Sequence, residues 1–272
     1  MVGAAAPSRG AGEGLPSAKP AIETGALTRT FDRFTALDGL TLSIPRGAFF
    51  GFLGPNGSGK TTTIKILAGL LRPTSGFARV AGFDVVERPL EVKRRIGLLS
   101  EDLTLYERLT GRELLEFSGR LHAVAPDVIR KRSEELLFLL DLEERADEML
   151  IDYSQGMKKK ATLAAALLHD PEVLLLDEPF NGVDPVSARV IKGILGKLAR
   201  TNTTVFLSSH ILEVVEKLCT EVAVVHHGRL VGKGPLEELR ERAKLGGSTS
   251  LEEVFLKLVE APEREGALSW KQ

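Results

Sequence analysis

The stretch GPNGSGKTT, from Gly54 to Thr62, restricts this chain more than any other part of its sequence. It follows the apolar run at residues 48–53 and precedes a segment compatible with a helix, which is the context of a phosphate-binding P-loop. The glycines let several backbone N–H groups face inward, Lys60 adds a positive charge, and the next helix adds its positive end. The loop predicts a site for the β and γ phosphates of a nucleotide, formed by Gly54, Pro55, Asn56, Gly57, Ser58, Gly59, Lys60 and Thr61, with Thr62 as a donor to the α-phosphate.

Two adjacent carboxylates end a second apolar run, at residues 173–176. Asp177 and Glu178 are costly to bury at the end of a strand unless they bind a cation or a reacting water. We therefore predict Mg²⁺ contacts from Thr61 and Asp177, and a general-base role for Glu178 toward the attacking water. A P-loop by itself fits kinases, GTPases, helicases and transport ATPases, and the two acids favour hydrolysis by water over transfer to a hydroxyl group.

Composition narrows the class of protein and its partners. The 272 residues are 43% hydrophobic and carry a net charge of −1, so we expect one or two globular domains and no nucleic-acid partner. The longest apolar runs fall far short of the roughly 18 to 20 residues of a spanning helix, so we expect no membrane span. The single cysteine, Cys219, excludes an internal disulfide and predicts a buried thiol in a reducing compartment.

Short apolar runs alternate with helical segments along most of the chain, which predicts an α/β fold around a buried sheet. The expected strands lie at residues 41–44, 48–53, 78–81, 96–99, 173–176, 204–208 and 222–225. Between about residues 101 and 170 the pattern is mostly helical, and apolar residues at a spacing of three to four predict helices at 112–122 and 128–140. Two short helices are expected near the C-terminus, at 235–244 and 250–258.

The sequence YSQGM, residues 153–157, opens a helical run shortly before the two acids. It resembles the Leu-Ser-Gly-Gly-Gln signature of the ATP-binding cassette (ABC) ATPases: Ser154 and Gly156 match it, and the other three positions depart from it. In this family the signature contacts the γ-phosphate held by the other subunit. The resemblance therefore implies a second copy or a homologous cassette, with two ATP molecules between the pair. We interpret Lys158 to Lys160 as a solvated face, since cations oppose the dipole at a helix start.

Three further positions match the family in order. Residues 181–185, NGVDP, resemble the D-loop that crosses the dimer interface, with Asp184 as its acidic residue. His210 follows an expected strand and matches the switch histidine that contacts the γ-phosphate. Phe31 lies where the family carries an aromatic residue that stacks on adenine; Phe34 is the alternative, and an ordinary core role stays open for either ring.

One departure from the family concerns its lid glutamine, at whose position this chain has Glu101. A glutamate offers an oxygen to Mg²⁺ as glutamine does, but it adds negative charge near the triphosphate and the attacking water. We expect Glu101 to contact Mg²⁺ or this water. Slower or differently coupled hydrolysis would follow from its charge.

The resemblance covers residues 22–258 and implies a P-loop NTPase fold with a RecA-like core, an antiparallel β subdomain and an inserted α-helical subdomain. On this basis we expect an ABC ATP-binding domain at residues 21–245, with the helical subdomain at about 101–170. Residues 1–20, rich in Ala, Gly, Ser and Pro, are expected as a flexible tail. Residues 246–272 are expected as a short C-terminal helical extension.

The implied activity is ATP hydrolysis that drives a separate integral membrane permease from the cytoplasmic face of the cell membrane. Residues 105–110 are expected to form part of the docking groove. The modified signature, Glu101 and the C-terminal stretch LEEVFLKL resemble exporter cassettes more than importer cassettes. The alternative is a soluble ABC ATPase acting on nucleic acid or ribosomes, which needs a coiled-coil arm, a second cassette or a basic patch.

Glu101→Gln tests the expected role of this carboxylate. We expect the ATPase rate and its dependence on Mg²⁺ concentration to change, because the substitution removes a negative charge beside the triphosphate. Steady-state phosphate release across a Mg²⁺ titration measures both. An unchanged rate with an unchanged Mg²⁺ dependence contradicts the role.

Overall fold

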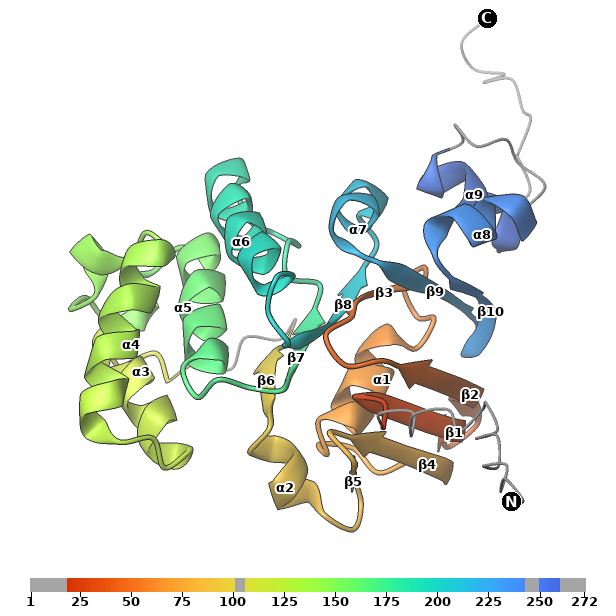
Figure 1. Ribbon diagram of the computed structural model, residues 1–272, viewed down its shortest axis with the longest axis horizontal. Coiled ribbons are helices and arrows are strands. Elements are labelled where there is room, and N and C mark those ends of the chain that lie inside the picture. Colours follow the sequence, from red (N-terminus) through yellow and green to blue (C-terminus); the bar gives the residue numbers. More distant parts are fainter. Residues whose placement is uncertain (1–18, 101–105, 243–249, 260–272) are drawn as a thin grey trace, which may run out of the picture.

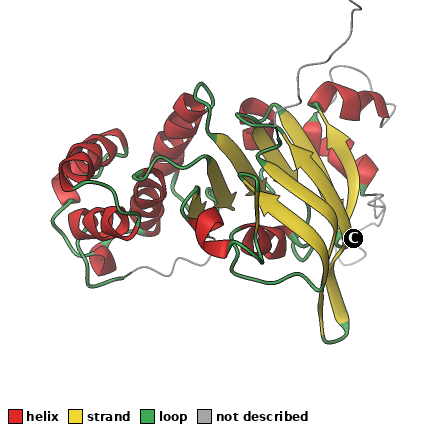
Figure 2. Cartoon of the chain, turned by 60° about the horizontal axis from the view of Figure 1, so that its bottom comes forward, coloured by secondary structure: helices red, strands yellow, loops and turns green. Residues whose placement is uncertain are grey.

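The computed structural model describes residues 19–100, 106–242 and 250–259. The protein consists of two sheets and a lobe of helices beside them (Figures 1 and 2). The central sheet contains, in spatial order, β10 (Arg229–Gly234), β9 (Glu221–His226), β3 (Phe49–Leu53), β8 (Thr204–Ser209), β7 (Val173–Asp177) and β6 (Ile96–Leu99). The pairs from β9 to β6 are parallel, whereas β10 runs antiparallel to β9. Every residue of β3, β7 and β8 is buried, as expected for parallel strands covered on both faces.

The second sheet is antiparallel. Its spatial order is β2 (Phe34–Ile44), β1 (Ile22–Phe31), β4 (Ser75–Val80) and β5 (Phe83–Asp84). Each predicted strand overlaps an observed one, but the sequence pattern missed β1, β5 and β10. In β1 the positive φ of Ala26 and the register shift between Thr24 and Leu27 interrupt the alternation of buried and exposed residues. In β10 glycines occupy alternate positions, which weakens the strand signal.

The central sheet separates two apolar clusters. On one face Phe50 and Phe52 pack with Ile64 of α1 and with the antiparallel sheet. On the other face Leu53 packs with Ile191 of α6 and its neighbours. The helices outside the lobe are α1 (Lys60–Leu67), α2 (Pro89–Lys93), α6 (Pro185–Leu198), α7 (Leu212–Leu218), α8 (Leu236–Arg242) and α9 (Leu251–Leu258). Since α1 lies between the two sheets, the loop that precedes it is held by both of them.

The helical lobe consists of α3 (Gly111–Leu121), α4 (Pro126–Leu139) and α5 (Gln155–Leu167), with short 3₁₀ turns at Glu143–Arg145 and Leu150–Asp152. It confirms the predicted helices at 112–122 and 128–140. Thr110 begins α3 with a capping box: its hydroxyl accepts from the Glu113 amide, and the Glu113 carboxylate accepts from the Thr110 amide. Helix α5 begins at Gln155, within the YSQGM stretch that was expected to open a helical run.

The lysine run at the start of α5 is not a solvated face, contrary to our expectation. Lys159 and Lys160 are each 4% exposed, and Lys158 lies 3.1 Å from the carboxylate of Glu107. The Nζ of Lys160 donates to the Asp141 carbonyl at 3.0 Å, and that of Lys159 reaches backbone carbonyls beyond β7. The helix packs against β6, α3, α4 and α6. Backbone carbonyl groups of nearby loops therefore replace water as the hydrogen-bond acceptors of the Lys159 and Lys160 ammonium groups.

The two predicted C-terminal helices are present as α8 and α9. Ser250 caps α9, since its hydroxyl accepts from the Glu253 amide at 3.3 Å. Most of the predicted N-terminal tail and of the C-terminal extension lies outside the described residues. Over residues 19–100, 106–242 and 250–259, no helix combines the length and apolar character that a membrane crossing requires.

A groove with a volume of about 710 Å³ runs between the central sheet and the helical lobe, and we call it the lobe groove. Two of its lining residues, His122 and His169, stack with ring centroids 3.6 Å apart and planes 13° apart. The Nε2 of His169 lies 2.9 Å from the Ile96 carbonyl, which can only accept, so this nitrogen carries the proton. Burial, helped by the nearby His122, lowers the pKa of His169 to about 4, and burial also lowers the pKa of His122.

The His169 pKa predicts a loss of stability in mild acid. Between pH 6.5 and 4 the unfolded chain binds a proton at this position that the folded chain does not, so the free energy of unfolding falls as the pH decreases. Because the ring is only partly buried, we expect a contribution on the order of 1 kcal/mol. Melting temperatures between pH 7.5 and 5 measure it. His169→Gln is expected to flatten the pH dependence; equal slopes in the variant and the unmodified chain contradict the assignment.

Candidate active site

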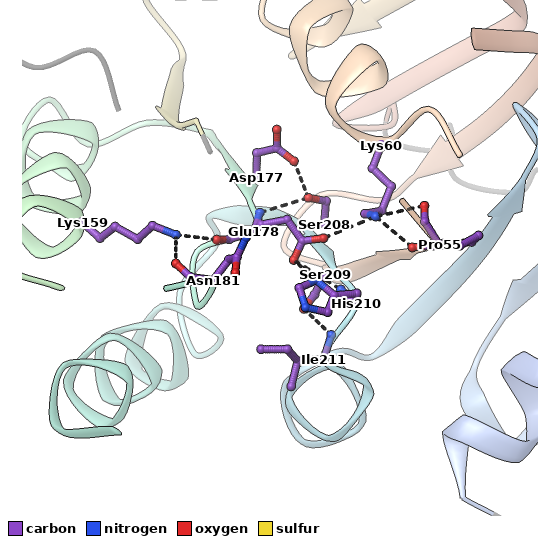
Figure 3. Close-up of polar contacts among 11 residues, drawn as sticks. Pro55, Lys60, Lys159, Asp177, Glu178, Asn181, Ser208, Ser209, His210 and Ile211 are labelled. Carbon is purple, nitrogen blue, oxygen red and sulfur yellow. Dashed lines mark hydrogen bonds and ion pairs between the residues drawn. The ribbon is translucent and has the colours of Figure 1, made fainter. Parts of the chain in front are cut away.

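The register of three parallel strands brings the predicted site residues to one edge of the central sheet. Leu53, the last residue of β3, pairs with Ser209 of β8. Asp177, the last residue of β7, pairs with Ser208. The loop after β3, the acids at the end of β7 and the residue after β8 therefore lie side by side, because parallel strands end at the same edge. Figure 3 shows Lys60, Glu178 and His210 meeting there.

The loop after β3 bends around a cavity of about 450 Å³, which we call the phosphate cavity. Gly59 has a φ of 105°, and a Cβ at this position would lie 2.5 Å from the Ala36 carbonyl, so only glycine fits. Gly57, with a φ of 79°, faces open space. The lining residues are Phe34, Ala36, Asn56, Gly57, Gly59, Lys60, Thr61, Thr62, Glu178, Asn181 and His210.

Lys60 is the charged centre of this loop. Its side chain is 6% exposed, and its Nζ donates to the Gly54 carbonyl at 2.8 Å. The same Nζ lies 3.4 Å from Oε1 of Glu178, whose side chain is 5% exposed. In a buried ion pair of this kind, each charge is compensated by the opposite charge of its partner. The structure therefore places the predicted phosphate ligand and the predicted base against each other at the wall of the phosphate cavity.

His210 holds the other carboxylate oxygen of Glu178. Its Nδ1 lies 2.9 Å from Oε2 and its backbone amide donates to the same oxygen at 3.3 Å. Since an ionised carboxylate only accepts, Nδ1 carries the proton in this contact. About half of the His210 side chain is exposed, so its other ring nitrogen can meet a ligand. Glu178 itself has a φ of 46°, a left-handed conformation that costs an L-residue about 1 to 2 kcal/mol.

The oxygen atoms near Lys60 fit a magnesium nucleotide. Asp177 is 1% exposed, and its Oδ1 accepts from Ser208 Oγ at 2.6 Å. Thr61 lines the phosphate cavity, and hydroxyl and carboxylate oxygens suit Mg²⁺. Ser58 Oγ is buried in the loop without a hydrogen-bond partner. Among the described residues no three His, Cys, Asp or Glu side chains gather into a metal cluster.

The signature and D-loop residues lie apart from this cavity. Ser154 is exposed and caps α5, accepting from the Met157 amide at 3.2 Å. Asp184 is exposed and caps α6; hydrogen bonds from Ser187 and Val186 hold the pKa of its carboxyl below the usual value. Neither these two residues nor Gly156 occur among the described residues that line the phosphate cavity. Glu101 lies outside the described part of the chain.

The structure brings Phe34 to the phosphate cavity, and not Phe31. The two residues pair at the turn of the β1–β2 hairpin. Phe31 is 40% exposed, and the guanidinium of Arg29 lies 4.3 Å from its ring centroid. Phe34 is 60% exposed and lines the cavity. The adenine contact predicted for Phe31 stays a prediction, and the geometry favours the alternative.

Ser208 and Lys159 are among the residues of the site that escaped the sequence patterns. Ser208 joins the acids, since its hydroxyl donates to Asp177 and accepts from the Glu178 amide at 3.1 Å. Lys159 donates to the carbonyls of Glu178 and Asn181. The two serines that end β8, Ser208 and Ser209, were a sequence signal for this role. Buried carboxylates such as Asp177 and Glu178 need hydrogen-bond donors beside them. No sequence signal distinguishes the buried Lys159 from its neighbours.

Comparison with known proteins agrees with this geometry. Residues 37–181, slightly more than half of the chain, match the family described as ABC transporter. The daunorubicin/doxorubicin resistance ATP-binding protein DrrA of Streptomyces peucetius is 40% identical over 220 residues, which cover 81% of this chain and 67% of that protein.

Solved structures extend the likeness to the fold. The ATP-binding subunit of an ABC transporter superposes with a TM-score of 0.82 at 30% identity, covering 88% of this chain and 99% of that one. A bacterial ABC transporter cassette solved as a dimer gives a TM-score of 0.73 at 25% identity, covering 79% and 98% of the two chains. Sequence, fold and site geometry lead to one assignment: the chain belongs to the ABC transporter family and is an ATP-binding, ATP-hydrolysing subunit.

Proposed function

We propose that this subunit drives export through a separate integral membrane permease, from the cytoplasmic face of the cell membrane. The observation that carries the proposal is the carboxylate of Glu178, held between Lys60 and His210 at the wall of the phosphate cavity. The name of the Streptomyces peucetius relative, a drug-resistance protein, supports export. The departures of this sequence from the family's signature and lid glutamine support it as well.

In the proposed mechanism, Lys60 and the backbone amides of the glycine-rich loop bind the phosphates of ATP. Mg²⁺, when bound, neutralises phosphate charge, with Thr61 and Asp177 as its protein contacts. Glu178 takes a proton from the attacking water at Oε1, while His210 fixes the orientation of the carboxylate through Oε2. Phe34, which lines the cavity, stacks on adenine, with Phe31 as the alternative that the family resemblance implies.

The site is completed by a second cassette, another copy or a homologue. Ser154 and Asp184 cap helices on the exposed surface and lie away from the phosphate cavity of their own chain. A serine hydroxyl at a helix N-terminus can donate a hydrogen bond to a phosphate, and this phosphate belongs to the nucleotide that the facing cassette binds. The dimeric cassette among the structural relatives supports this arrangement. Closing the pair around ATP and opening it after hydrolysis then changes the state of the permease.

The lobe groove is the proposed docking site for the permease. It joins the central sheet to the helical lobe, so a partner seated in it responds when these parts move. Tyr106 and Phe117 pack edge to face in its lining, with centroids 5.0 Å apart. Leu121 is 69% exposed and Leu70 58%, which leaves apolar area for a partner segment.

Glu178→Gln tests the role of the base. We expect turnover to fall by about 10² to 10⁴, because the neutral amide cannot take the proton, while ATP still binds. Phosphate release gives the rate, and equilibrium binding of labelled ATP gives the affinity. The matched control is Glu172→Gln, a neighbouring partly exposed glutamate paired with Arg46, which is expected to keep the normal rate. A normal rate in Glu178→Gln contradicts the mechanism.

Leu121→Glu tests the docking proposal. A charge in the lobe groove opposes burial of an apolar partner, so we expect permease-containing membranes to bind the variant at least about 10-fold more weakly. Basal ATPase activity is expected to stay within about twofold, since the substitution lies far from the phosphate cavity. Phe138→Glu, at a 67% exposed position on α4 outside the groove, is the control. Equal membrane binding by both variants and the unmodified chain contradicts docking in the groove.

A further inference from the structure

One buried cation links the start of α5 to the reaction centre. Lys159 lies in the second turn of α5, and its side chain is buried at 4% exposure. Its Nζ donates to the backbone carbonyls of Glu178, at 2.8 Å, and Asn181, at 2.6 Å (Figure 3). Neither bond takes part in the proposed proton transfer to Glu178. An ammonium group is costly to bury unless such acceptors surround it, so its position is fixed by these contacts.

The main chain of Glu178 is held from both sides. Its amide donates to Ser208 Oγ at 3.1 Å and lies 3.2 Å from the Ser208 carbonyl. Its carbonyl accepts from Lys159 and, at 3.2 Å, from the Asn181 amide. The φ of Glu178 is 46°, and a residue with a side chain keeps this conformation only where its surroundings impose it. Ser208 and Lys159 supply that constraint on opposite sides of the residue.

The direction of the carboxylate follows from this backbone conformation. Oε2 lies 2.9 Å from Nδ1 of His210, and Oε1 lies 3.4 Å from Nζ of Lys60. A relaxed φ at Glu178 would swing the side chain away from both groups. A general base must stay within hydrogen-bond reach of its proton, and a displacement near 1 Å costs about 10²-fold in rate.

The same lysine belongs to the helix that begins with the signature. A Cβ at Gly156 would lie 2.7 Å from Oδ2 of Asp184 and 2.6 Å from Oγ of Ser187, so the start of α5 packs directly on the start of α6. A shift of α5 is therefore transmitted to the main chain at Glu178 through Lys159. If Ser154 contacts the nucleotide of a facing cassette, this connection joins one nucleotide site to the base of the other.

We propose that Lys159 is a positioning residue: it fixes the main chain at Glu178, aims the general base, and couples that aim to the position of α5. The inference rests on the proposed role of Glu178 as the base. Lys159 does not touch the reacting atoms, so its removal affects the chemical step while leaving nucleotide binding in place.

The test is Lys159→Met, with Lys160→Met as its matched control. The two lysines are neighbours on α5 with equal exposure, but Lys160 donates to Asp141 in the helical lobe, away from the site. We expect Lys159→Met to lower kcat by about 10- to 100-fold with the Kd for ATP changed by less than about twofold. Lys160→Met is expected to lower the melting temperature comparably and to keep kcat. Equal kcat values in the two variants overturn the proposal.

A double variant separates this inference from the mechanism on which it rests. Added to Glu178→Gln, the Lys159→Met change is expected to cause no further loss of single-turnover hydrolysis, since no base remains to be aimed. A further loss of 10-fold overturns the positioning role while the base role stands. A normal rate in Glu178→Gln alone overturns both. If Lys159→Met does not fold, Lys159→Gln, compared with Lys160→Gln, takes its place with the same expected and overturning results.

Discussion

The parallel pairing of β3, β8 and β7 is the constraint on which the site depends. The register that sets Leu53 beside Ser209 and Ser208 beside Asp177 determines where three loops begin. None of these loops is close to the others in sequence, and no direct contact between them is needed to bring them together. The burial of all residues in these strands resists any slip of register, because a slip would break the packing on both faces of the sheet.

Charge compensation is the second requirement of the site. Lys60, Lys159 and Glu178 are all nearly inaccessible to solvent, yet each lies against carbonyl oxygens, an opposite charge or a polar hydrogen. Removing one member of such a network leaves another buried group without its hydrogen-bond or charge partner, which is costly in free energy. The conformation of each side chain therefore depends on the others. Lys60 and Glu178 therefore do not act as independent side chains, even in the absence of ligand.

The sequence sufficed wherever the signal was local. The loop around Lys60, the acids that end β7 and the helices of the lobe follow from glycine spacing, apolar runs and helical periodicity. What it did not reveal depends on tertiary contacts. Lys159 is one of three adjacent lysines, and only the packing of α5 decides which one faces Glu178. The bulged strand β1 escaped because its alternation is broken, and only the geometry at the hairpin turn shows that Phe34 lines the cavity while Phe31 does not.

The left-handed backbone of Glu178 has a consequence for how this chain tolerates change. Folding alone would favour glycine or asparagine at such a φ, since these residues adopt it with less strain. Neither residue supplies a carboxylate. With Glu178 in its proposed role as the base, a chain selected only for thermal robustness would drift toward an inactive sequence at this position, and the glutamate marks a place where activity is maintained against the preference of the backbone.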